Sequence, residues 1–84
     1  MSKTRVQIFF LRRLVSLLRD RKIFDYNEDW NSLRVSFVLT GSNPLDQLTV
    51  NKIRELFNAS LVTLTIEGNS LRVTIHQVEF PLFN

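Results

Sequence analysis

The chain has 84 residues, 44% of them hydrophobic, with no cysteine, one histidine and a formal net charge of +3 at pH 7. The missing cysteines exclude disulfides, thiolate metal sites and a cysteine nucleophile, and a lone histidine excludes an ordinary zinc site within one chain. No apolar run approaches the roughly 20 residues that span a bilayer, so the sequence predicts one folded domain over residues 1–84 and no transmembrane segment.

The first 22 residues carry most of the positive charge. They hold seven basic residues against Asp20 alone, a net charge of +6, whereas residues 23–84 hold four basic and seven acidic residues, a net charge of −3. Arginine outnumbers lysine eight to three over the whole chain, and its planar guanidinium suits phosphate. Any anionic partner is therefore expected at residues 1–22.

Residues 1–22 predict a basic amphipathic helix, regular from about Thr4 to Lys22. At 100° per residue the apolar side chains cover a sector about 200° wide, roughly twice the stripe that a surface helix needs. That sector contains Val6, Ile8, Phe10, Leu11, Leu14, Val15, Leu17 and Leu18. Phe9 falls among the arginines and is expected to be exposed in a monomer. The helix is predicted to pack on the core while keeping a spare apolar edge beside a basic face.

The next segment, KIFDYNEDWNS, clusters Asp, Asn and Ser and predicts a connecting loop. We expect its larger side chains to pin it to the core, namely Ile23, Phe24, Tyr26 and Trp30. Residues 33–39 then alternate and predict a strand with one buried face. The buried face is expected to contain Leu33, Val35, Phe37 and Leu39, and the other face Arg34, Ser36 and Val38.

Residues 44–58 predict a second helix. Asn43 followed by Pro44 suits a helix start, with Asn43 as the cap and Pro44 in the first helical position. Thr49 offers a second possible cap, so the sequence leaves open whether the helix begins at Pro44 or Val50. Apolar residues recur at helical spacing at Leu45, Leu48, Ile53, Leu56 and Phe57.

Two alternating runs around Gly68-Asn69 predict a β-hairpin over residues 61–78. Its register pairs apolar residues on one face, Ile66 with Leu71, Leu64 with Val73 and Val62 with Ile75. The other face pairs Thr65 with Arg72, Thr63 with Thr74 and Leu61 with His76. The last segment, residues 79–84, is an apolar tail in which Pro81 prevents an ordinary central strand. It either closes the core or docks into another chain.

These elements predict an α+β fold with the order helix, strand, helix, strand, strand. The two helices are expected on one face of a small mixed three-stranded sheet. The first two strands, joined through a helix, would run parallel by a right-handed crossover, and the hairpin would add an antiparallel strand.

The sequence predicts no catalytic residues, no cofactor and no metal site. A nucleophilic triad needs a base, and His76 is the only histidine. The acidic cluster of Asp25, Glu28 and Asp29 is typical of solvated turns. The sequence contains neither GxxxxGK[ST] nor GxGxxG, so it offers no phosphate-binding loop.

Three hypotheses about function follow. The first is a non-enzymatic regulatory or accessory protein that binds proteins and forms a homodimer, in the style of small viral or phage proteins. Its interface is predicted to contain Val6, Phe9, Phe10, Phe80, Leu82 and Phe83. The second is a nucleic-acid-binding protein that contacts phosphates through Arg5, Arg12, Arg13, Arg19, Arg21 and Lys22. The third, ranked below it, is peripheral membrane binding by the same helix. The lack of cysteine favours a reducing compartment, so we expect a cytoplasmic protein.

Overall fold

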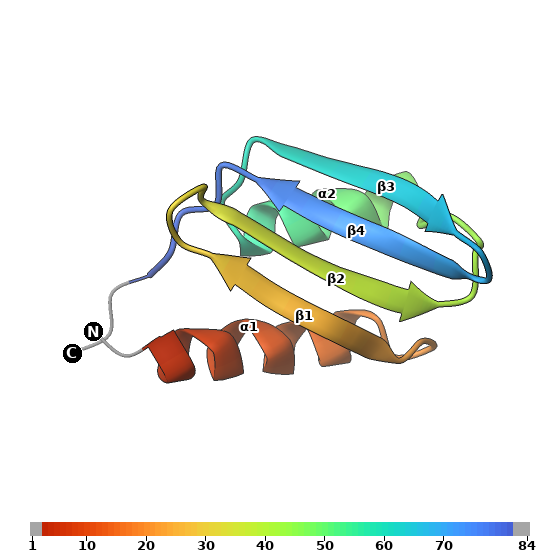
Figure 1. Ribbon diagram of the computed structural model, residues 1–84, viewed down its shortest axis with the longest axis horizontal. Helices are drawn as coiled ribbons and strands as arrows, with labels where there is room; N and C mark the ends of the chain where they lie inside the picture. The colour runs from red at the N-terminus through yellow and green to blue at the C-terminus, as the bar shows by residue number, and fades with distance from the viewer. Residues whose placement is uncertain (1–2, 82–84) are drawn as a thin grey trace.

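Two helices and four strands form a two-layer α+β domain, in which both helices cover the same face of one sheet (Figure 1). The computed structural model describes residues 3–81. The helices span Lys3–Leu17 (α1) and Gln47–Leu56 (α2). The strands span Ile23–Asp29 (β1), Arg34–Thr40 (β2), Leu61–Glu67 (β3) and Ser70–His76 (β4). The predicted α+β class is confirmed, but the sheet has four strands rather than three.

The strands lie in the order β1-β2-β4-β3, and every neighbouring pair is antiparallel. The crossover through α2 leaves β2 and β3 pointing the same way, but β4 lies between them and no parallel pair forms among residues 3–81. The predicted mixed sheet is therefore wrong. With β4 in the centre, Leu71, Val73 and Ile75 are at most 1% exposed, whereas Ile66 at the β3 edge is 62% exposed. Both strands of the hairpin have an apolar face, so the local pattern does not determine which of them pairs with β2.

The segment predicted as a loop is strand β1, at one edge of the sheet. It pairs with β2 from Ile23 opposite Leu39 to Asp29 opposite Arg34, with a shift of register between Phe24 and Asn27. Asp25 lies in this bulge with φ of 54°. An extra residue in a strand shifts the two-residue alternation of side chains, so the strand pattern is broken in the sequence.

The β1–β2 turn also changes the expected place of Leu33. Asp29 accepts hydrogen bonds from the backbone N–H groups of Asn31 and Ser32, at 3.1 and 3.0 Å, which fixes the turn. Leu33 follows with φ of 54° and is 47% exposed, so it lies outside the buried face of β2. The other three residues predicted for that face, Val35, Phe37 and Leu39, are fully buried.

The bounds of both helices differ from the predicted ones. α1 ends at Leu17 rather than Lys22, since Arg21 N–H bonds the carbonyl of Leu18 in a turn and the Lys22 carbonyl accepts from Thr40 N–H in the sheet. α2 begins at Gln47, not at Pro44 or Val50. Its cap is Asp46, whose carboxylate accepts a 2.7 Å hydrogen bond from the Thr49 N–H.

The predicted hairpin register is confirmed for all six predicted pairs, and a seventh pair, Glu67 opposite Ser70, adjoins the turn. Gly68 has φ of 60°, whereas Asn69 is not among the residues with positive φ. A positive φ at only the first turn residue is the pattern of a type II′ turn. Glycine adopts it without steric strain.

The core lies between the helices and the sheet. α1 contributes residues at intervals of four, which places them on one helix stripe, and the β2 and β4 residues alternate as expected. The fully buried residues of the core are Val6, Phe10, Leu14, Val35, Phe37, Leu39, Ile53, Phe57, Leu71, Val73 and Ile75. The rings of Phe10 and Phe57 lie 4.2 Å apart and join the two helices.

Candidate interaction surfaces

The residues predicted as a protein interface do not form one surface. Val6 is fully buried and Phe10 is 1% exposed, so both belong to the core and no partner reaches them without opening the domain. Leu82 and Phe83 lie outside the described residues. Only Phe9 and Phe80 of the predicted set lie partly at the described surface.

Phe9 is half-buried rather than exposed. It packs against the core, contacts the Phe10 ring edge-on at 5.3 Å, and is covered by the Arg13 guanidinium at 3.9 Å from its ring centre. The spare apolar edge of α1 lies elsewhere on the helix, at Ile8 and Val15, which are 46% and 58% exposed. The sequence correctly indicates a surplus of apolar residues on this helix but assigns it to the wrong flank.

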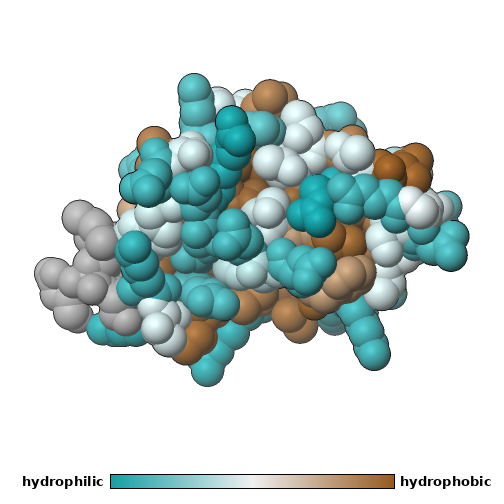
Figure 2. Space-filling model, viewed as in Figure 1, coloured by the Kyte–Doolittle hydropathy of each residue, from teal (hydrophilic) through white to brown (hydrophobic). Residues whose placement is uncertain are grey.

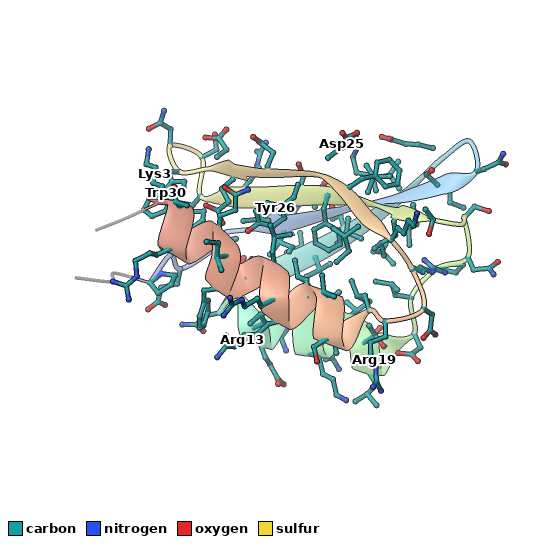
Figure 3. The ribbon with its side chains drawn as sticks, turned by 90° about the horizontal axis from the view of Figure 1, so that it is seen from below. Lys3, Arg13, Arg19, Asp25, Tyr26 and Trp30 are labelled. Carbon is teal, nitrogen blue, oxygen red and sulfur yellow. The ribbon has the colours of Figure 1, made fainter. Side chains whose placement is uncertain are left out.

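Phe80 packs on its own domain. Its ring stacks on Trp30 with centroids 4.4 Å apart and planes 11° apart, and it meets Phe10 edge-on at 6.4 Å. The ammonium group of Lys3 lies 5.3 Å from the Trp30 ring, and Figure 3 shows the two residues side by side. The described part of the tail therefore joins the β1–β2 turn to the start of α1.

A carboxylate supports this aromatic contact from β1. Glu28 accepts a 2.5 Å hydrogen bond from the Tyr26 hydroxyl and a 3.0 Å bond from the Trp30 indole N–H. Burial raises the pKa of the Tyr26 phenol, and the hydrogen bond to Glu28 and its negative charge raise it further. Tyr26 therefore acts as a neutral hydrogen-bond donor that fixes Glu28 and, through it, Trp30.

The predicted basic surface is divided. Arg5, Arg12, Arg13 and Arg19 are exposed, and Figure 3 shows Arg13 and Arg19 on the side of the molecule away from the sheet. Three of them, Arg5, Arg12 and Arg13, line a shallow hollow of about 280 Å³ together with Ile8 and Phe9. Arg21 instead is half-buried and donates to the Asn43 carbonyl. Lys22 is exposed, but its backbone is bonded to Thr40.

The sheet face opposite the helices is polar, as the hairpin register predicts. Arg72 forms a 2.8 Å ion pair with Glu67, and the imidazole Nε2 of His76 lies 3.0 Å from the Thr63 hydroxyl. Val38 is buried on this face with Phe24 and Arg72 as its cross-strand neighbours.

The outer edge of β3 is a surface that the sequence reasoning missed. β3 ends the sheet, and no strand among residues 3–81 pairs with its outer side. Leu61 and Ile66 are 52% and 62% exposed, and Figure 2 shows a hydrophobic group at the right-hand end of the molecule, where β3 ends and α2 begins. A signal was present in the sequence, because LVTLTI contains six residues with no charge, glycine or proline.

The hairpin geometry defines which backbone groups face outward. In a hairpin closed by a two-residue turn, the pair beside the turn exchanges hydrogen bonds and the following pairs alternate. Glu67, Thr65, Thr63 and Leu61 therefore direct their N–H and C=O groups toward β4. Val62, Leu64 and Ile66 direct theirs outward, at the open edge.

Comparison of the chain with known protein families, with curated protein sequences and with solved structures finds no match. Among the described residues, no helix is both long enough and apolar enough to cross a bilayer.

Proposed function

We propose that the protein is a non-enzymatic regulatory or accessory protein that binds another polypeptide chain along the open edge of β3. The observation that carries this proposal is a seven-residue edge strand, uncharged over its first six residues, that keeps unbroken register with β4 on its inner side. Such an edge presents a row of unpaired backbone donors and acceptors to any extended segment. Adding a strand there is an established mode of peptide recognition.

The exposed side chains support the same site. Ile66 lies on the apolar face beside Leu71, and Leu61 lies on the polar face beside His76. A strand added outside β3 would cover part of both, which removes apolar surface from water as well as pairing the backbone. Natural sheets protect long flat edges because uncovered ones aggregate, so this edge is best explained by a bound partner.

A test compares two variants of matched chemistry. Ile66→Lys places a charge at the β3 edge, whereas Val15→Lys places one on the exposed flank of α1, and both replaced side chains are more than half exposed. We expect the natural chain and Val15→Lys to capture a protein partner from lysate, with and without nuclease. Ile66→Lys should fail to capture it. Capture that survives Ile66→Lys but disappears with Val15→Lys would move the site to α1.

A second candidate function is binding of nucleic acid by α1. The observation that favours it is the group of exposed arginines, Arg5, Arg12 and Arg13, around one hollow in a segment with a net charge of +6. Binding to random RNA or DNA should then weaken steeply with added salt and fall with Arg12→Glu. The control is Lys52→Glu on the exposed side of α2. Binding to anionic vesicles instead would favour the membrane hypothesis.

A further inference from the structure

We infer that the chain bound at the β3 edge is a second copy of this protein, paired antiparallel about a two-fold axis that passes beside Leu64. This inference rests on the proposed function, and it adds the identity of the partner and the register of the contact. The resulting dimer would contain one continuous sheet of eight strands, with two copies of β3 at its centre.

The register follows from the length of β3 and from which of its residues direct their backbone groups outward. The strand runs from Leu61 to Glu67, so its middle residue is Leu64. A two-fold axis at Leu64 aligns all seven residues with the partner strand. It also sets the three outward-facing residues opposite one another, Val62 with Ile66 of the second copy, Leu64 with Leu64, and Ile66 with Val62. Residues in such facing pairs exchange both of their backbone hydrogen bonds.

The side chains are self-complementary in this register. Val62, Leu64 and Ile66 lie on the face toward the helices in both copies, so the exposed Ile66 would pack against Val62 of the second copy. On the polar face Thr63 would lie opposite Thr65, a favourable cross-strand pair. Glu67 would lie opposite Leu61, and its charge is already balanced by Arg72. No two like charges face each other.

The other surfaces of the molecule suit self-association less well. A second copy pairing along the exposed flank of α1 would bring Arg5 and Arg12 near the same residues of its partner, and like charges at close range repel. The outer edge of β1 is interrupted by the bulge at Asp25. Among the surfaces formed by residues 3–81, the β3 edge alone combines regular backbone with side chains that match their own copy.

The size of the domain gives a reason to associate. A chain of this length buries only about 60–65% of the surface that its unfolded form exposes, so small domains often gain stability from a second subunit. A two-fold axis perpendicular to the sheet would place both helix layers on one face. Figure 1 shows α2 behind β3 and β4, so the two copies of α2 would lie near each other across the axis.

Cysteine cross-linking tests the register directly, since the natural chain contains no cysteine. In the inferred dimer Thr63 faces Thr65 of the second copy, at a separation that permits a disulfide. Two copies of the same threonine lie on a diagonal about 7–8 Å apart, beyond the reach of a good disulfide. We expect a mixture of Thr63→Cys and Thr65→Cys chains to give at least about tenfold more covalent dimer on oxidation than either variant alone.

Two companion variants keep the test decisive. Leu64→Cys should cross-link with itself, because Leu64 faces its own copy at the axis. Ile66→Pro removes an outward N–H and leaves the bonds to β4 in place, so it should weaken the dimer about tenfold or more by light scattering. Unchanged circular dichroism would show that Ile66→Pro still folds.

The outcomes separate the inference from the proposed function. A chain that is monomeric by light scattering at submillimolar concentration, yet captures another protein in an Ile66-dependent way, overturns the homodimer and leaves the function intact. Strong cross-linking of Thr63→Cys or Thr65→Cys with itself overturns the Leu64 register. If Ile66→Pro changes neither dimer nor capture, both proposals are wrong.

Discussion

The two edge strands of this sheet, β1 and β3, differ in the regularity and charge of their unpaired outer edges. β1 carries a bulge at Asp25 and acidic side chains along its length, and it ends in a turn held by Asp29. β3 is regular, uncharged over six residues and half exposed at both ends. Bulges and charges are devices by which sheets prevent edge pairing. One edge is therefore closed to other strands and the other is open.

The same difference separates stability from binding. The β1 edge is tied to the rest of the domain by Trp30, which contacts Phe80, Glu28 and Lys3. At the β3 edge, Leu61 and Ile66 are instead more than half exposed. We therefore expect substitutions at the β1 edge to change the free energy of unfolding, and substitutions at the β3 edge to change association.

The largest expected effect is that of Trp30→Ala. The substitution removes the stack on Phe80 and the hydrogen bond to Glu28, and it should lower the free energy of unfolding by about 2–4 kcal/mol, somewhat below the cost for a fully buried aromatic. Leu61→Ala on β3 is the control, with an expected change within about 0.5 kcal/mol. Urea denaturation followed by circular dichroism measures both. Equal losses would remove the proposed difference between the edges.

A charge placed on β3 should prevent pairing of its edge with another strand, as the bulge and the acidic residues do at β1. Thr65 lies on the polar face and is exposed, so the substitution Thr65→Lys should have little effect on folding. The lysine would face Thr63 of a second copy and should weaken self-association about tenfold, roughly the effect of 1.4 kcal/mol. Analytical ultracentrifugation over a range of concentrations checks this. Association of unchanged strength would show that β3 is not the contact.

Much of β3 and β4 could be predicted from the sequence because a hairpin depends on local features. Alternation and the Gly68-Asn69 turn together predict six of the seven pairs that the hairpin forms. Strand β1 could not be predicted in this way, since the bulge at Asp25 breaks the alternation and the acidic residues that protect an edge are also typical of loops. The residues that prevent this edge from pairing with another strand are the same residues that remove the strand pattern from the sequence.

The position of the candidate site depends on contacts that are distant in the sequence. β3 and β4 each have one apolar face, and nothing local decides which of them pairs with β2. Once β4 takes that place, β3 becomes the edge and Ile66 becomes exposed. Similarly, the apolar sector of α1 is wide enough to pack in several orientations, and only the completed core shows that Phe10 is buried and Val15 is not.

An alkaline titration should test the anchoring of β1. The pKa of Tyr26 is raised above its ordinary value of 10.0, chiefly by burial and then by Glu28. A raised phenol pKa contributes stability that is present below pH 10 and is lost as the pH rises above it. Tyr26 is the only tyrosine, so tyrosinate absorbance reports it alone. We expect no ionisation near pH 10 in the folded protein, and ionisation together with unfolding at higher pH.

The matched variant for this titration is Glu28→Gln. It keeps a hydrogen-bond acceptor near the Tyr26 hydroxyl but removes the negative charge that helps to raise the pKa. Tyr26 should then ionise at a lower pH than in the natural chain, and self-association through β3 should not change. Identical titration curves would show that Glu28 does not act on Tyr26.

The smallest expected effect is at the β1–β2 turn in acid. Hydrogen bonds from the backbone and side chain of Ser32, and then from the backbone of Asn31, hold the pKa of Asp29 below its ordinary 3.8. A lowered carboxyl pKa contributes stability above that value and loses it as the pH falls through the folded-state pKa. The urea midpoint should therefore decrease below about pH 4, and less steeply in Asp29→Ala. Self-association through β3 should be equally strong in Asp29→Ala and in the natural chain, because the turn lies at the far edge of the sheet. A change in association caused by Asp29→Ala would instead place part of the contact at β1.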